Sequence, residues 1–140
     1  MHHVLEKGFQ AGSVIGVALV VPAVAWRRGR SAGTLAGAGP ALLKALGTSA
    51  LVGTGVAGAL GVAMIASIPS DERAAGLQDR AYRLHWNRAQ NRTDLFSEVG
   101  MALGGTAALF VSPAAAVVVG GAAAGSAVGV LLHTATRAAE

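Results

Sequence analysis

Long apolar runs without charged residues constrain this chain more than any other feature. Residues 8–26 form a run of 19 without Asp, Glu, Lys or Arg, and residues 45–68 form a second run of 24. As helices these runs rise about 28 Å and about 36 Å, enough to cross a hydrocarbon core about 30 Å thick. Both are therefore predicted to span a membrane.

A third uncharged run covers residues 99–132 and is divided by Ser112 and Pro113. A proline at this place most simply marks a tight turn, which predicts two further spans, at about 95–112 and 114–132. The alternative is a single long, kinked helix, giving three spans in all, because proline does occur inside membrane helices.

The composition agrees with a membrane protein. Hydrophobic residues make up 53% of the 140 residues, charged residues only 13% and aromatic residues only 4%. Soluble domains carry about 25% charged residues. We therefore predict one all-α membrane domain over residues 1–140, an integral bundle of four glycine-rich transmembrane helices. No cleaved targeting segment is expected, and the absence of cysteine excludes disulfides and thiolate chemistry.

Two polar stretches separate the runs. Residues 31–40 are rich in Gly, Ala and Pro and predict a loop. Residues 71–98 hold five acidic residues and five arginines, and Ser70 is a plausible helix N-cap for the polar segment 70–94. We predict an interfacial helix here, between the second and third spans, on the membrane surface or against a partner. The third span is expected to begin near Thr93.

Each predicted span carries small residues four positions apart, which is the spacing of one helix face. Lipid gives helices no hydrophobic reason to associate, so close van der Waals contact across small residues has to hold them together. The predicted packing residues are Gly8, Gly12, Gly16, Gly53, Gly61, Gly100, Gly104, Gly121, Gly125 and Gly129.

The formal charge of +4 lies mainly in linkers, so it indicates topology and not nucleic-acid binding. Basic residues follow Trp26 and place the first loop on the matrix or cytoplasmic side, with both termini opposite. The residues expected to contact partner subunits or lipid are Arg27, Arg28, Arg30, Arg88, Arg92 and Asp94.

No arrangement of residues indicates catalysis. None of the four histidines is predicted to share metal-ligand spacing with another histidine or a carboxylate, apart from the adjacent His2 and His3. Hydroxyl residues within the runs lack a nearby base. We therefore expect no catalytic, cofactor or metal residues, and the chain is compatible with a bound phospholipid such as cardiolipin.

Four glycine-faced spans, a basic first loop and the stretch RAQNRTDLFSEVGMALGG resemble the mitochondrial inner-membrane preprotein and amino-acid transporter family. The family's signature places Arg and Asp before a helix that opens with spaced glycines. The matching residues are Arg88 or Arg92, Asp94, Gly100 and Gly104, although the spacing departs from the pattern.

The resemblance implies one of two roles, a protein translocase channel subunit or a non-catalytic accessory subunit of respiratory complex I. Because the predicted spans hold no charge at membrane depth, we favour the accessory subunit, multi-pass in the mitochondrial inner membrane with membrane subunits as partners. Two alternatives stay open: a translocase or small-solute channel, and a self-associating glycine-zipper protein.

Overall fold

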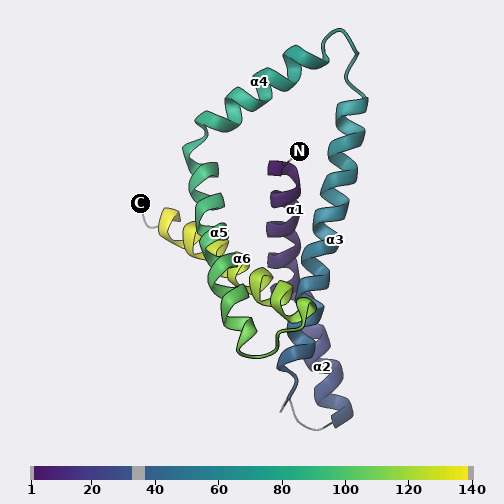
Figure 1. Ribbon diagram of the computed structural model, residues 1–140, viewed down its shortest axis with the longest axis vertical. Helices are drawn as coiled ribbons and strands as arrows, with labels where there is room; N and C mark the ends of the chain where they lie inside the picture. The colour runs from purple at the N-terminus through teal and green to yellow at the C-terminus, as the bar shows by residue number, and fades with distance from the viewer. Residues whose placement is uncertain (1, 33–36, 139–140) are drawn as a thin grey trace.

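The computed structural model describes residues 2–32 and 37–138, and it is helical in every long element of that part of the chain. Figure 1 shows the helices in order. They are α1 (His2–Ile15), a π-helical turn η1 (Gly16–Val20), α2 (Val21–Ala32), α3 (Gly39–Ala66), α4 (Arg73–Trp86), α5 (Arg88–Leu109) and α6 (Ala115–Ala138). The all-α prediction is confirmed for the described residues.

Helices α1 and α2 form one continuous rod with a π turn near its middle. The Val21 amide bonds to the Gly16 carbonyl, five residues back, directly before Pro22. Proline has no amide hydrogen and crowds the carbonyl of the preceding turn, and a π turn is one way for a helix to absorb that defect. The rod contains the predicted span 8–26 and extends beyond it at both ends.

The predicted loop at 31–40 is shorter in the structure. Gly37 has φ +73°, a left-handed conformation that glycine adopts without steric cost, and α3 begins at Gly39. Pro40 lies in the first turn of α3, where its missing amide hydrogen would have had no partner. Residues 33–36 lie outside the described residues.

Helix α4 begins three residues later than the predicted N-cap. The Glu72 amide bonds to the Pro69 carbonyl at 3.2 Å, so residues 69–72 form the turn that redirects the chain after α3. The Ser70 N-cap is therefore wrong, because helical geometry starts only after that turn. Helix α4 has no buried residue and crosses from the end of α3 to the start of α5 (Figure 1).

Helix α5 begins at an N-cap residue that comes before the predicted start near Thr93. The Asn87 side chain accepts a hydrogen bond from the Gln90 amide at 3.1 Å, and helical residues follow from Arg88. Asparagine is among the best N-cap residues because its side chain satisfies an otherwise free amide of the first turn. The polar segment 70–94 is thus divided between α4 and the first part of α5.

Helices α5 and α6 form an antiparallel hairpin. Gly100 lies against Gly125 and Gly104 lies against Gly121, so the two helices run in opposite directions. The turn between them covers residues 110–114, where the predicted break lies. The alternative prediction of one kinked helix over residues 99–132 is therefore wrong.

Small side chains form the core where α1, α3 and α6 meet. Leu46, Ala50 and Ala123 are buried together, and Phe9 and Val21 pack against them. The accessible surface is 8684 Å², whereas a soluble monomer of 13.8 kDa would expose about 6,600 Å². The bundle is open and buries little large apolar surface of its own.

Within residues 2–32 and 37–138, three helices are long and apolar enough to cross a membrane: His2–Arg30, Gly39–Ala66 and Ala115–Ala138. Helix α5 is not among them, because its first half carries Arg88, Arg92, Asp94 and Glu98. The membrane character of the chain is therefore supported by three helices. The predicted span at 95–112, which lies in α5, is not confirmed.

Candidate functional site

Helices α1 and α3 approach each other through backbone contacts at glycine. A Cβ atom on Gly8 would lie 2.5 Å from the Gly53 carbonyl oxygen, and one on Gly12 would lie 2.5 Å from that of Ser49. Between the same helices the Ser49 hydroxyl donates to the Gly12 carbonyl at 2.8 Å. A side chain larger than hydrogen at Gly8 or Gly12 would therefore push the helices apart.

The α5–α6 hairpin is closed in the same way. A Cβ atom on Gly125 would lie 2.5 Å from the Gly100 carbonyl carbon, and one on Gly129 would lie 2.6 Å from that of Phe96. Close approach of this kind increases van der Waals contact, which is the main attraction between helices in lipid. Small residues spaced by four thus line both helix pairs.

Other predicted packing residues fall into the same two seams. Gly16 lies against Leu46, and Gly104 and Gly121 face each other. Gly61 is half-buried and lies on the groove between α1 and α3. One close contact escaped the sequence reasoning: Gly47 of α3 lies against Gly120 of α6, where the two helix pairs join.

A buried hydroxyl pair lies between α5 and α6. The Ser97 and Ser126 hydroxyl groups are 2.7 Å apart, and both side chains are fully buried. Each hydroxyl can satisfy the other in a place that water does not reach. The pair adds polar specificity to a seam formed otherwise by glycine and alanine.

The most concentrated polar chemistry lies where the first part of α1 meets α5. Lys7 forms an ion pair and hydrogen bond with Asp94 Oδ1, and Gln10 Nε2 donates to the same oxygen at 3.0 Å. His3 Nδ1 lies 3.4 Å from Asp94 Oδ2. These contacts tie two segments that are more than 80 residues apart in the sequence.

Gln10 is the organising residue of this polar cluster. Its side chain is only 5% exposed, yet it accepts from Lys7 at 2.8 Å and donates to both Asp94 and Glu6 Oε1, the latter at 3.1 Å. A buried amide is costly unless it is hydrogen-bonded, and here both its oxygen and its nitrogen have partners. Gln10 therefore holds the Glu6 and Asp94 carboxylates at fixed positions.

Electrostatics keep Asp94 ionised. Burial raises the pKa of the Asp94 carboxyl, but the hydrogen bonds from Lys7 and Gln10, with the charges of Lys7 and His3, outweigh burial and hold the pKa below its ordinary value. The neighbouring side chains thus stabilise the charged form of the Asp94 carboxyl.

The structure corrects the expectation that histidines and carboxylates lack metal-ligand spacing. His3 and Glu6 are three residues apart on one helix, and potential ligand atoms of His3, Glu6 and Asp94 all lie within 4.8 Å of one another. Two of the three residues are close in sequence, but Asp94 joins them only through the fold.

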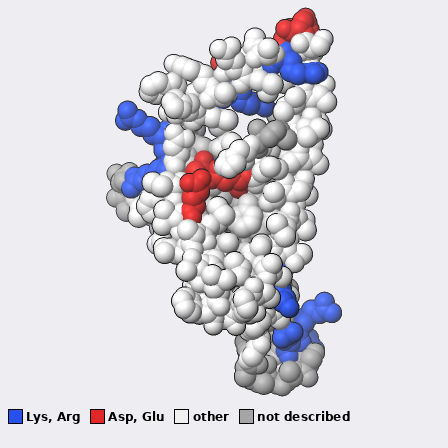
Figure 2. Space-filling view, viewed as in Figure 1, with Lys and Arg blue, Asp and Glu red and all other residues white. Residues whose placement is uncertain are grey.

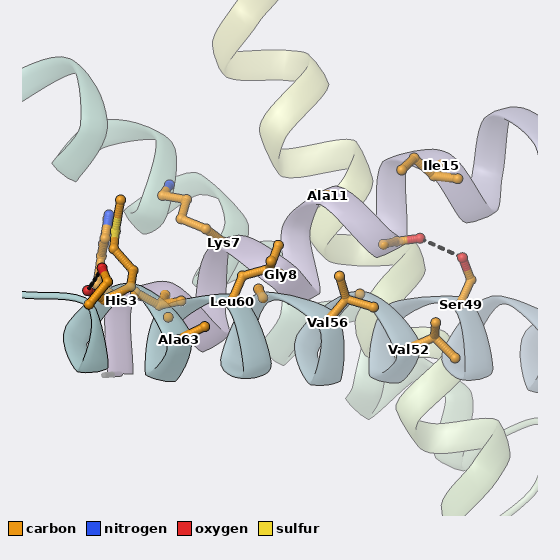
Figure 3. Close-up of a pocket in the computed structure, with 17 residues that line it drawn as sticks. His3, Lys7, Gly8, Ala11, Ile15, Ser49, Val52, Val56, Leu60 and Ala63 are labelled. Atoms are coloured by element: carbon orange, nitrogen blue, oxygen red, sulfur yellow. Dashed lines mark hydrogen bonds between the residues drawn. The ribbon is translucent and has the colours of Figure 1, made fainter.

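An apolar groove of about 980 Å³ follows the seam between α1 and α3 on the surface of the bundle. Figure 3 shows Val52, Val56 and Leu60 along one side of α3, with His3 near one end and Ser49 near the other. Nearly all of the lining is aliphatic or glycine. The groove suits an apolar occupant and offers few groups for water.

The predicted basic contacts occupy two regions. Arg27, Arg28 and Arg30 lie on the last turns of α2 and are exposed, with the Arg30 guanidinium 5.6 Å from the centre of the Trp26 ring. Figure 2 shows this basic group at one end of the molecule, away from the acidic patch near its middle.

The two predicted arginines of α5 lie near its start. Arg88 is its first residue and is exposed, and the Arg92 guanidinium lies 5.8 Å from the centre of the Phe96 ring. Of the predicted contact residues, Asp94 is brought into the polar cluster.

Comparison with known families adds one result. The sequence matches a protein-family model described as "Protein of unknown function (DUF1757)" over residues 1–136. The chain belongs to the DUF1757 family. No curated protein matches it. The match covers all the helices that build the seams and the polar cluster, so these features lie within the DUF1757 region.

Sequence reasoning missed Glu6 and Lys7, which precede the first predicted span, and Gln10, which lies within it. A signal existed in the spacing, since Lys7 and Gln10 are three residues apart and fall on the helix face that also carries His3. Their partner could not be found in this way, because no local pattern links α1 to Asp94.

Proposed function

We propose that this protein is a non-catalytic structural subunit of a larger hetero-oligomeric membrane complex. The observation that carries the proposal is the amount of large apolar side chain left on its surface. Exposed aliphatic and aromatic residues occur on several helices, including Leu19, Val52, Val56, Leu60, Leu103, Phe110 and Leu131. Lipid can cover part of this surface, and helices of other subunits would cover the rest.

The glycines pack helices within one chain, which favours partner subunits that are not identical copies. Gly8, Gly12, Gly100 and Gly125 contact backbone within the same chain. These glycines are therefore occupied and would not be available to join identical copies. Outward contacts would then fall to Val, Leu and Ala, which favours an accessory role over a self-associating glycine zipper.

The groove supports the same choice over a channel. A conducting path for ions or polar solutes needs polar groups or water along its length. Among the described residues, the polar side chains that line the α1–α3 groove are His3, Lys7, Ser49 and Ser67, and the other lining residues are apolar. This lining suits a partner helix or an acyl chain better than a solute.

The family resemblance given by Asp94, Gly100 and Gly104 suggests the host complex. By that analogy the protein would be an accessory subunit of the membrane arm of respiratory complex I, in the mitochondrial inner membrane, where it would stabilise assembly. The basic end of α2 would face the matrix by the positive-inside rule, with both termini and α4 on the intermembrane-space side. Arg27, Arg28 and Arg30 could also bind an anionic phospholipid such as cardiolipin.

A mild-detergent native gel of host membranes, followed by mass spectrometry of the band that contains this protein, tests the proposal. We expect comigration with respiratory complex I. A small band of the chain alone would favour self-association, and comigration with translocase subunits would favour the channel alternative. Either result would refute the accessory role.

Two variants test whether packing supports assembly. Gly12→Leu places a large side chain against Ser49 and Ala50 and should reduce incorporation into the complex. Leu19→Ile, at an exposed position on the same rod, should be tolerated. Equal incorporation of the two variants would contradict a packing role for Gly12.

A further inference from the structure

We propose that His3, Glu6 and Asp94 form a binding site for one divalent transition-metal ion of the zinc class. The ion would join the first turns of α1 to α5. This inference does not depend on the identity of the host complex, because it rests on side chains within the chain.

The positions of the three side chains fit a metal site. Their potential ligand atoms all lie within 4.8 Å of one another, and His3 Nδ1 is 3.4 Å from Asp94 Oδ2. In a tetrahedral site with zinc bonds of about 2.0–2.2 Å, two ligand atoms lie about 3.3–3.6 Å apart. The His3–Asp94 pair already has this separation, and Glu6 lies one helical turn from His3.

Neighbouring donors orient the carboxylates as an outer shell would. Lys7 and Gln10 both donate to Asp94 Oδ1, which leaves Oδ2 as the oxygen next to the His3 ring. Gln10 also donates to Glu6 Oε1. Metal-binding carboxylates are commonly held by such second hydrogen bonds, and this fixes the ligand atoms before the ion binds.

The charge balance of the cluster gives a separate reason for a cation. The Glu6 and Asp94 side chains are only 10% and 14% exposed, and Lys7 is paired with Asp94. Glu98 lies close enough to Glu6 to act on it electrostatically, and the two line a crevice of about 260 Å³. Glu98 is exposed, so the half-buried Glu6 and Asp94 side chains carry two negative charges beside the one ammonium group of Lys7, and half-buried carboxylates without a balancing charge are unfavourable.

The ligand types select the class of ion. Calcium and magnesium prefer sets made only of oxygen, whereas one imidazole nitrogen with two carboxylate oxygens suits zinc. Three protein ligands leave one tetrahedral position for water. The site would therefore bind zinc with one coordination position open.

The test is titration of the chelator-stripped full chain, purified in detergent, with zinc chloride, followed by calorimetry and by metal analysis after gel filtration. We expect one zinc per chain. Asp94→Asn and Glu6→Gln should each weaken binding at least about tenfold. Circular dichroism and the elution volume of each variant show whether it is folded.

The matched controls lie on α4, away from the cluster. Asp79→Asn removes an exposed carboxylate paired with Arg83, and His85→Ala removes an exposed histidine. Both should bind zinc like the wild type. Absence of stoichiometric binding by the wild type would overturn the proposal. Wild-type affinity in folded Asp94→Asn would also overturn it, because the ion would then be held by residues of α1 without Asp94.

Discussion

Replacing Gly125 by alanine should separate α5 from α6 although it adds only one methyl group. The new Cβ atom would lie inside contact distance of the Gly100 carbonyl oxygen and 2.5 Å from its carbon, where ordinary contacts begin at 3.4 Å. One helix must therefore retreat by roughly 1 Å, and a gap of that size forfeits up to about half of each contact energy it affects.

The magnitude follows from three contributions. Overpacking of this kind costs about 1–3 kcal/mol. Loss of the neighbouring Ser97–Ser126 hydrogen bond adds about 0.5–1 kcal/mol. Alanine has a higher helix propensity than glycine, which offsets the destabilisation by about 1 kcal/mol. We expect a net destabilisation of about 0.5–3 kcal/mol in the free energy of unfolding.

The matched control is Gly55→Ala on α3, where a Cβ atom would meet nothing within 4 Å. It should leave stability unchanged or increase it by up to about 1 kcal/mol, because only helix propensity changes. The assay is unfolding of both variants in mixed dodecylmaltoside and sodium dodecyl sulfate micelles, followed by far-ultraviolet circular dichroism. Equal shifts of the two midpoints would refute the idea that α5 and α6 require glycine at their contact.

Three further predictions concern the polar contacts. In the presence of a metal chelator, Lys7→Met and Asp94→Asn should show a coupling free energy of about 1–2 kcal/mol in a double-mutant cycle, since the ion pair is half-buried. A coupling near zero would mean that the ion pair adds nothing to the α1–α5 contact. Folding lowers the pKa of Asp94, so the contribution of its carboxylate to the free energy of unfolding should be complete above the ordinary aspartate range near pH 4. That contribution should be lost only as the pH falls through the lower pKa of the folded state. A stability difference between wild type and Asp94→Asn that already shrinks at pH 6 would contradict this. Ser97→Ala or Ser126→Ala alone should cost about 1 kcal/mol, and the double variant should cost less than the sum, because a single change strands a buried hydroxyl; strict additivity in denaturation would argue against the pair.

Much of the helix content could be predicted because it depends on local sequence. The absence of charge over residues 8–26 and 45–68 is enough to indicate two long apolar helices, and Pro113 marks the turn between α5 and α6. The start of α5 could also have been found. Asn87 followed three residues later by Gln90 is a capping-box pattern, and it was overlooked in favour of a start near Thr93.

Contacts between distant segments could not be predicted in the same way. The meeting of Gly47 with Gly120 depends on how α6 crosses α3, and a spacing rule on either helix does not fix that crossing. The polar cluster depends on the depth at which α5 sits beside α1. Asp94 was expected to contact a partner or lipid, whereas the structure places it against Lys7 and Gln10 of its own chain.

The most direct test of the account is the side of the membrane on which each end of the bundle lies. The chain has no cysteine, so Arg28→Cys, Asp79→Cys and Arg137→Cys each introduce a unique thiol for labelling by an impermeant maleimide in sealed vesicles. We expect Arg28→Cys to be labelled from one side, and Asp79→Cys and Arg137→Cys to be labelled from the other. Labelling of Arg28→Cys and Asp79→Cys from the same side would contradict a membrane crossing by α3, and labelling of Arg137→Cys opposite to Asp79→Cys would contradict a hairpin of α5 and α6 that enters and returns.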